Sequence, residues 1–143
     1  MAEYTYNPIQ EIAVNGSALF NDSIPCNRGL IYHRNESGVF VLRGIVNNPC
    51  QNFARYQITF NGNIAVPEEE TVAPISVAIA IDGEAILTSN AIVTPTVVDA
   101  YFNATSTAFI DIPRGCCFSI SIENTSTIPI NLQNANLVIT REA

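Results

Sequence analysis

The side chains that could take part in covalent or metal chemistry are few and widely spaced. The chain has four cysteines, Cys26, Cys50, Cys116 and Cys117, and one histidine, His33. A cysteine nucleophile needs a base within hydrogen-bond distance, and a zinc site needs paired ligands at short spacing. No CxxC pair is present, and His33 stands in LIYHRNESG, a strand pattern that leads into a turn. We therefore predict a protein that is not an enzyme and has no cofactor, with His33 as a hydrogen-bonded structural residue.

One acidic run invites comparison with a calcium site. The loop VPEEETVAP places Glu68, Glu69 and Glu70 side by side, and calcium prefers several carboxylate oxygens. The run lacks the spacing of a known calcium loop, so these glutamates are weak calcium candidates. The alternative interpretation is a solvated loop that keeps a sheet edge soluble.

The adjacent thiols of Cys116 and Cys117 open the alternating segment CFSISI. Neighbouring residues of a strand point to opposite faces. We therefore expect one thiol inside the fold and the other at a surface or subunit contact. Synthesis in the cytoplasm favours free thiols, whereas a disulfide between Cys26 and Cys50 after release stays open.

A polar segment, CNRGLIYHRNESG, gathers several charged and titratable side chains. They form a candidate docking patch or intersubunit salt-bridge cluster: Arg28, His33, Arg34 and Glu36. Ordinary surface charges that flank a strand are the alternative interpretation.

Composition narrows the partners of this 143-residue chain. Charged residues make up only 13%, against about 25% in ordinary domains, so part of the surface is expected to be covered by other copies. A net charge of −7 with six scattered basic residues excludes a basic patch for nucleic acid. The first residues lack a basic region followed by an apolar one, and no apolar run approaches 18 residues. We expect synthesis in the cytoplasm without a signal peptide, and no membrane insertion.

The elements that must position these residues are almost all strands. Alternation of β-branched and aromatic residues with polar ones, broken by turn formers, predicts about ten of them. The expected strands cover residues 11–20, 29–34, 38–46, 53–66, 74–82, 84–93, 96–102, 105–112, 116–123 and 130–140. Asp82-Gly83 predicts a hairpin turn, and Asn61-Gly62 a bulge or bend inside a long strand. The resulting fold class is an all-β antiparallel sandwich or jelly roll.

The alternation also assigns faces. The residues expected on an inward face, as core or trimer interface, are Tyr56, Ile58, Phe60, Phe118, Ile120, Ile122, Leu137 and Ile139. Residues 1–12 lack clean alternation and are interpreted as an arm outside a single domain at 13–143, with a frayed terminus as the alternative. Candidate residues for scaffold attachment in this arm are Tyr4, Tyr6, Pro8 and Ile9.

The order of the strands resembles that of C1q and tumour-necrosis-factor-like domains. The segments that carry the likeness are SGVFVLRGIV, ARYQITFNGNIAV, SVAIAIDGEAI, STAFIDIPRGCCFSISI and NLQNANLVIT, within residues 29–140. The closing strand lacks the Phe-x-Gly of many C1q-like domains. This resemblance implies a ten-stranded jelly roll that assembles as a homotrimer, with one sheet of each subunit facing the threefold axis.

A narrower resemblance concerns ALFNDSIPCNRGLIYHRNESGVFVLRG and PINLQNANLVITR. These segments are similar to small proteins encoded near the capsid genes of phages of Gram-positive gut bacteria. The likeness implies a virion surface protein, a head fibre or capsid decoration, with capsid protein and a host surface glycan as its expected partners. Its expected role is adhesion or particle stabilisation. The alternatives are a bacterial or spore-surface C1q-like binding module and, from another class, a small-ligand or metal-binding jelly-roll enzyme.

Overall fold

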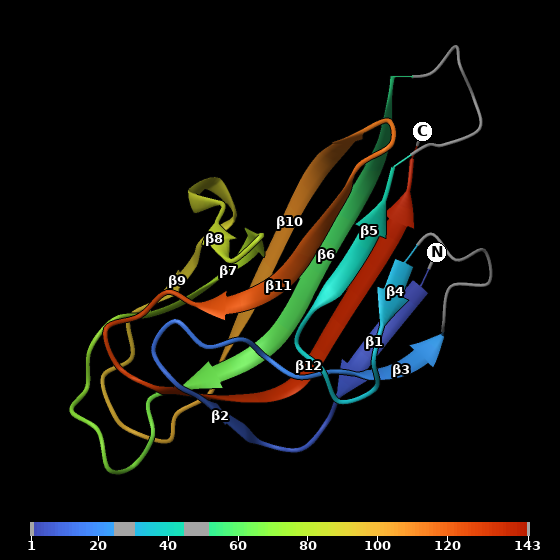
Figure 1. Ribbon diagram of the computed structural model, residues 1–143. Coiled ribbons are helices and arrows are strands. Elements are labelled where there is room, and N and C mark those ends of the chain that lie inside the picture. The colour runs from blue at the N-terminus through green and yellow to red at the C-terminus, as the bar shows by residue number, and fades with distance from the viewer. Residues whose placement is uncertain (1, 25–30, 45–51, 143) are drawn as a thin grey trace.

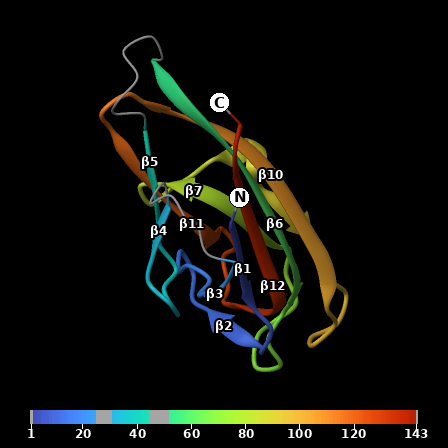
Figure 2. The same ribbon diagram turned by 90° about the vertical axis from the view of Figure 1, so that its right-hand side faces the viewer.

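The alternating segments build two antiparallel sheets that pack face to face (Figure 1, Figure 2). The computed structural model describes residues 2–24, 31–44 and 52–142. Sheet A has the order β10-β6-β12-β1-β3, with β2 also paired to β12, and sheet B has the order β4-β5-β11-β7-β8, with β9 also paired to β7. The predicted class, an all-β antiparallel sandwich, is confirmed.

Sheet A contains β1 (Ala2–Tyr6), β2 (Gln10–Ile12), β3 (Asn21–Ile24), β6 (Phe53–Ala65), β10 (Phe102–Pro113) and β12 (Ile130–Arg141). Sheet B contains β4 (Ile31–His33), β5 (Phe40–Arg43), β7 (Ile75–Ile81), β8 (Glu84–Ala85), β9 (Ala91–Val93) and β11 (Cys117–Asn124). The 3-10 turn η1 (Leu87–Ser89) joins β8 to β9. The described ranges contain no helix with the length and apolarity that crossing a membrane requires.

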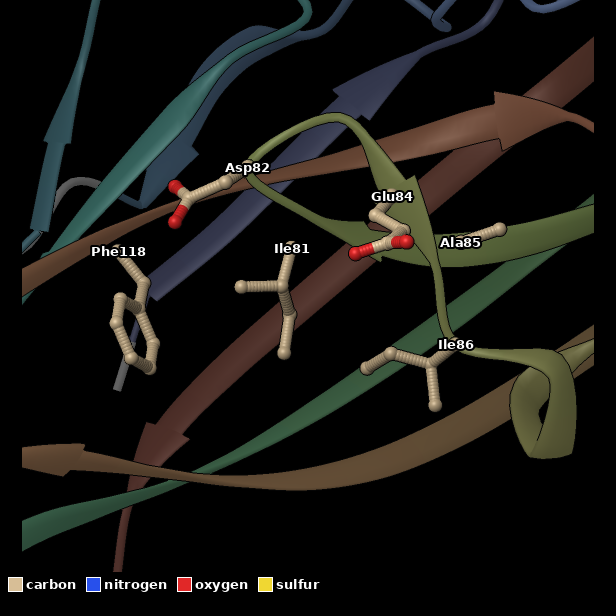
Figure 3. Close-up of a pocket in the computed structure, with 6 residues that line it drawn as sticks. All are labelled: Ile81, Asp82, Glu84, Ala85, Ile86 and Phe118. Carbon is tan, nitrogen blue, oxygen red and sulfur yellow. The ribbon is translucent and has the colours of Figure 1, made fainter.

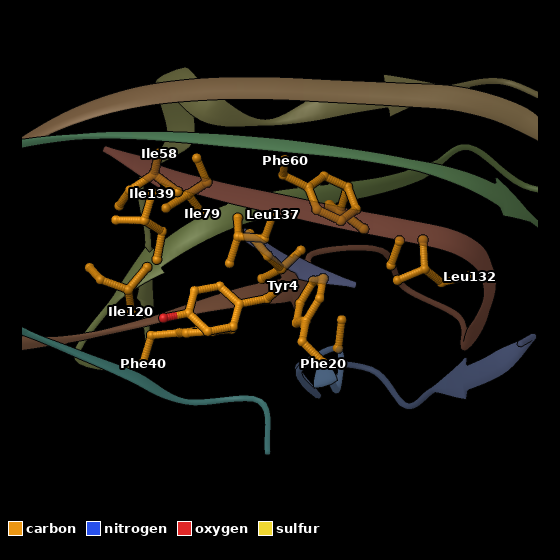
Figure 4. Close-up of a cluster of buried hydrophobic side chains, with 14 of the residues drawn as sticks. Tyr4, Phe20, Phe40, Ile58, Phe60, Ile79, Ile120, Leu132, Leu137 and Ile139 are labelled. Atoms are coloured by element: carbon orange, nitrogen blue, oxygen red, sulfur yellow. The ribbon is translucent and has the colours of Figure 1, made fainter. Parts of the chain in front are cut away.

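The space between the sheets is filled by the inward rows of side chains (Figure 4). Ile58 and Phe60 of β6 lie opposite Ile139 and Leu137 of β12, and all four are fully buried. Ile79 of β7 reaches the same cluster from sheet B. Burial of a side chain of this size contributes about 1.5–3 kcal/mol, so this interior is the main source of stability.

The eight residues that the alternation placed on an inward face lie inside the single chain. The buried ones are Tyr56, Ile58, Phe60, Ile120, Ile122, Leu137 and Ile139. Phe118 is partly buried and packs against the core. These side chains therefore fill the sandwich, and a surface for other copies has to be sought on an outward face.

The first residues belong to sheet A. β1 pairs antiparallel with β12 from Ala2 opposite Ile139 to Tyr6 opposite Ala135, and β3 pairs with the other side of β1. Tyr4 is buried, because its ring fills the interior next to sheet B. The predicted division into an arm at 1–12 and a domain at 13–143 does not hold for the structure. Pairing with a strand more than 130 residues away overrides the weak local pattern.

Three expected strands also differ from the observed elements. The strand expected at 11–20 ends with β2 at Ile12, and Asn15 in the turn that follows has a φ of 63°. Residues 96–102 form a loop up to Phe102, where β10 begins, and Asp99 within the loop has a φ of 57°. The expected strand at 84–93 is interrupted by η1, because the hydroxyl oxygen of Ser89 accepts a hydrogen bond from Ile79 N–H at 2.9 Å. A side chain there supplies the partner that a continuous neighbouring strand would have supplied.

The turn and the irregularity predicted from the sequence have closer counterparts in the structure than these three strands have. Asp82 and Gly83 have φ values of 51° and 84°, the left-handed pair that a two-residue hairpin turn requires. The irregularity expected at Asn61-Gly62 lies on the facing strand, where β12 shifts register between Gln133 and Asn136. Gly62 serves close packing, since a Cβ there would meet the Leu132 side chain at 2.8 Å.

Candidate subunit interface

The outward face of sheet A is broad and almost uncharged. We call it the polar face and define it by Thr5, Gln57, Thr59, Asn61, Asn63, Asn103, Thr105, Thr107, Phe109, Asn136, Val138 and Thr140. These residues form rows across the strands, for example Thr107, Thr59 and Val138. The charged outward side chains of the described strands β1, β2, β6, β10 and β12 are Glu3, Glu11, Arg55 and Asp111. A chain of net charge −7 thus keeps most of its charge off this face.

The amide and hydroxyl groups of the polar face bond to one another. Asn103 Nδ2 donates to Asn61 Oδ1 at 2.7 Å, and Thr105 Oγ1 donates to the same oxygen at 3.0 Å. Asn63 Nδ2 donates to Asn134 Oδ1 at 3.2 Å. Polar groups that already have partners can be removed from water at lower cost than unpaired ones. The network therefore suits a surface that another subunit covers.

The two opposite charges on this face neutralise each other. Arg55 donates two hydrogen bonds to the carboxylate of Asp111, at 2.7 and 3.0 Å, and its guanidinium lies 5.0 Å from the centroid of the Phe53 ring. These hydrogen bonds hold the pKa of Asp111 below its usual value and raise the pKa of Arg55. A hollow of about 400 Å³ lies beside the pair and is also lined by Phe109, which is 61% exposed.

The edge of the sandwich next to β10 is apolar. Leu87 of η1 is 78% exposed and Ile92 of β9 is 65% exposed, and both elements contact β10. Phe102, at the start of β10, is exposed as well. We call these three residues the apolar edge. β10 ends sheet A, so one side of this 12-residue strand has no partner among the described strands. Proteins normally cover or interrupt such an edge.

Within the predicted docking patch, Arg28 lies outside the described residues. His33 is buried, with 1% of its side chain exposed. Its Nδ1 lies 2.6 Å from Asp22 Oδ1 and its Nε2 lies 2.8 Å from the carbonyl oxygen of Ser37. The ring stacks on Phe40 at 4.1 Å. His33 is therefore a packing residue, as its sequence context indicated, and cannot take part in an exposed patch.

The other members of the predicted sites lie mostly at the surface. Arg34 and Glu36 are exposed in the turn between β4 and β5. Among the residues proposed for scaffold attachment, Tyr6 is partly buried, whereas Pro8 and Ile9 are exposed.

The glutamates of the 66–74 loop do not form a recognisable metal site. Glu68 and Glu69 are exposed and Glu70 is partly exposed in a turn that Glu70 N–H closes onto the carbonyl oxygen of Pro67 at 3.0 Å. Over residues 2–24, 31–44 and 52–142, no group of three or more possible metal ligands comes together.

The vicinal cysteines differ from their prediction. Cys116 and Cys117 are both free and exposed, so neither packs in the core. Cys116 lies in the turn that connects β10 in sheet A to β11 in sheet B. Because this residue precedes the strand, the alternation of side chains between the two faces of a strand does not apply to it. Cys26 and Cys50 lie outside the described residues.

Sequence reasoning missed the apolar edge and the pairing of Arg55 with Asp111. The alternation in FARYQITF and FIDIP predicts that Arg55 and Asp111 point outward. A further prediction that these two strands pair would have placed the two charges side by side. Leu87 and Ile92 carry no such signal, because an irregular connection decides their exposure.

Comparison with known proteins identifies the fold. No protein-family model matches the sequence, and neither does any curated protein. Among solved structures, murine APRIL at pH 5.0 matches with a TM-score of 0.64 and 11% identity, over 99% of this chain and 98% of that chain. Eiger TNF from S. frugiperda matches with a TM-score of 0.62 and 9% identity, over 99% and 92%.

The globular domain of zebrafish complement 1qA is similar too, with a TM-score of 0.59 and 10% identity over 96% of both chains. At these identities the likeness concerns the fold alone. The chain has the jelly-roll fold of TNF and C1q domains, as its strand order indicated.

Proposed function

We propose that this chain is a non-enzymatic subunit that assembles into a closed trimer, in which the apolar edge of each copy packs on the polar face of the next. The observation that carries the proposal is the combination of two complementary surfaces on one molecule. One is a 12-residue edge strand beside exposed Leu87 and Ile92, and the other is a nearly uncharged sheet face.

The geometry favours a ring. The edge and the face are different surfaces, so their contact is heterologous, and a heterologous contact either closes a ring or grows without limit. The C1q/TNF-like strand order supports closure at three subunits. Closure of the ring would cover the free side of β10 and the apolar edge in every copy. No copy would then expose an edge through which it could aggregate.

The role that we propose for the trimer is that of a virion surface protein, a phage head fibre or capsid decoration. Support comes from the resemblance of ALFNDSIPCNRGLIYHRNESGVFVLRG and PINLQNANLVITR to small proteins encoded near phage capsid genes. Three equivalent sites on one particle would act together, because linked binding events raise the effective concentration. Adhesion to a host surface glycan would use the loops, such as residues 66–74.

The first experiment is the solution mass by light scattering on a sizing column. A trimer has three times the mass of the 15.5 kDa chain, and a stable monomer would overturn the assembly. The virion role is tested separately, by mass spectrometry of density-purified particles from a lysate of the encoding host. Particles without this chain would overturn that role and leave the trimer standing.

A further inference from the structure

A second hollow, of about 440 Å³, opens beside the turn between β7 and β8 (Figure 3). Its apolar wall is made by Ile81, Ile86 and Phe118, which are all partly buried and pack against the core. Ile81 lies between the other two side chains in Figure 3. The wall thus presents an aromatic ring and aliphatic side chains that remain partly exposed.

The rim of the hollow carries two carboxylates, from Asp82 and Glu84. Asp82 is held in place from two directions. Its backbone adopts a left-handed turn conformation with a φ of 51°, and its Oδ1 accepts hydrogen bonds from the N–H and the hydroxyl of Ser119, both at 2.9 Å. A charge that is already fixed loses little freedom when it binds a ligand.

These carboxylates lack a positive partner in the part of the chain that the structure describes. The ion pairs found there join His33 to Asp22 and Arg55 to Asp111. Ser119 satisfies one oxygen of Asp82 with neutral donors. Glu84 pairs with Ile81 through its backbone, and its carboxylate forms no ion pair within the described residues. The hollow therefore combines apolar surface with uncompensated negative charge.

We propose that this hollow binds the basic side chain, lysine or arginine, of a partner protein. The long aliphatic stem of such a residue would lie on Ile81 and Ile86, as these stems often do on apolar surface. Its charge would meet the carboxylates of Asp82 and Glu84, and the face of the Phe118 ring would attract it further. The carboxylates give the hollow the charge that is complementary to this occupant and reject an acidic one.

The open shape of the hollow favours a side chain over a free small molecule. Pockets for free ligands bury about 70–90% of the ligand surface, whereas this hollow faces solvent. A side chain carried by a larger molecule gains further contacts around the rim. The inference deepens the proposed adhesion role, but it concerns residues outside the polar face and so does not depend on the trimer.

The test uses three capped peptides with the intact protein labelled with ¹⁵N: acetyl-Gly-Lys-Gly-amide, acetyl-Gly-Arg-Gly-amide and acetyl-Gly-norleucine-Gly-amide. Two-dimensional NMR spectra follow the backbone amides of Ile81, Gly83, Glu84 and Phe118 during titration. We expect saturable shifts at these amides with the lysine or arginine peptide. Norleucine has a similar stem without the charge, and we expect about tenfold weaker binding for it, from the loss of two exposed charge contacts.

The matched variants change charge alone. Asp82→Asn with Glu84→Gln removes two charges from the rim, and asparagine both tolerates the left-handed backbone and keeps an acceptor for Ser119. Glu68→Gln with Glu69→Gln removes two charges from the exposed 66–74 loop. We expect about tenfold weaker binding in the rim variant and unchanged binding in the loop variant.

Absence of shifts at the hollow with both basic peptides would overturn the proposal. So would equal binding of the norleucine peptide, or an equal loss in the loop variant, because the rim charges would then confer no selectivity. Light scattering on the same samples separates the two proposals. A trimer that fails to bind overturns only the hollow, and a monomer that binds overturns only the assembly.

Discussion

His33 is the one residue whose type most invites a chemical role, and the fold uses it for packing. Its ring contacts Phe40, stacked at 4.1 Å, and Tyr4, edge-on at 4.9 Å. Its Nδ1 faces the Asp22 carboxylate and its Nε2 faces the Ser37 carbonyl oxygen, both within hydrogen-bond distance. The side chain thus ties β3 to β4 and to the turn that follows β4.

We expect His33→Ala to lower the free energy of unfolding by about 2–4 kcal/mol, because it opens a cavity and removes the hydrogen bonding of the imidazole ring. Urea unfolding followed by circular dichroism measures the change. Arg34→Ala, at the exposed neighbour, serves as the control and should change the free energy by less than about 0.5 kcal/mol. Equal effects of the two substitutions would show that the His33 ring has no structural role.

The Asp82 carboxylate makes stability depend on pH. The hydrogen bonds from Ser119 N–H and hydroxyl hold the pKa of Asp82 below its usual value. A carboxylate with a lowered folded-state pKa stabilises the fold above its unfolded-state pKa, about 3.9, and this contribution is lost as the pH falls through the folded-state pKa.

We expect the melting temperature of Asp82→Asn to lie below that of the wild type at neutral pH. The two melting temperatures should converge as the pH falls below about 4, since protonation removes the charge from the wild type too. Thermal unfolding by circular dichroism between neutral and acidic pH measures the difference. A difference that stays constant with pH would contradict the role of the charge.

Among the elements, β1 shows how pairing decides what a short segment becomes. AEYTY has three apolar positions in five and could be read as a loose terminus. Its backbone nevertheless bonds to β12 along five residue pairs and to β3 on the other side. Without β1, the two strands would be separated and β12 would become a second free edge.

Deletion of residues 1–6 is therefore expected to abolish soluble folding. The deletion exposes the buried site of Tyr4 and unpairs β12 over Ala135–Ile139, and aromatic truncation alone costs about 3–5 kcal/mol. Expression in the soluble fraction and circular dichroism measure the outcome. The double substitution Pro8→Ala and Ile9→Ala, at exposed positions beyond β1, should leave folding intact. A folded deletion variant would restore the interpretation of the segment as an arm.

For the whole molecule, the distribution of charge over the surface is the main clue to assembly. The outward side of sheet A carries one balanced ion pair and the acids Glu3 and Glu11, while Leu87 and Ile92 are exposed at the edge. Apolar surface, and polar surface whose groups are already hydrogen-bonded, costs less to bury than charged surface. These two surfaces are the basis of the assembly that we propose.

If the proposed trimer forms as described, Phe109→Glu should dissociate it into folded monomers. Phe109 is 61% exposed in one chain, so a charge there does not disturb the core, whereas an unpaired charge buried between subunits costs several kcal/mol. Light scattering and circular dichroism together measure mass and folding. Tyr32→Glu, at a position of similar exposure on β4, should leave the trimer intact. A trimeric Phe109→Glu would exclude this face from the interface.

The sequence by itself determined the long strands, their inward rows and the left-handed turn at Asp82-Gly83. These features are local, because side chains of a strand alternate between faces and only certain residues adopt a positive φ. Tyr56, Ile58 and Phe60 could be placed inside from their spacing alone. The strand order also led to the C1q/TNF-like fold.

Only the tertiary structure decided which strands pair over long distances and which surfaces remain open. β1 joins β12 across the length of the chain, Leu87 is exposed by an irregular connection, and Cys117 faces solvent at the start of its strand. The hollow with Asp82, Glu84 and Phe118 likewise exists only because β7, β8 and β11 meet. Such features depend on contacts between distant segments, and no local pattern of residues contains that information.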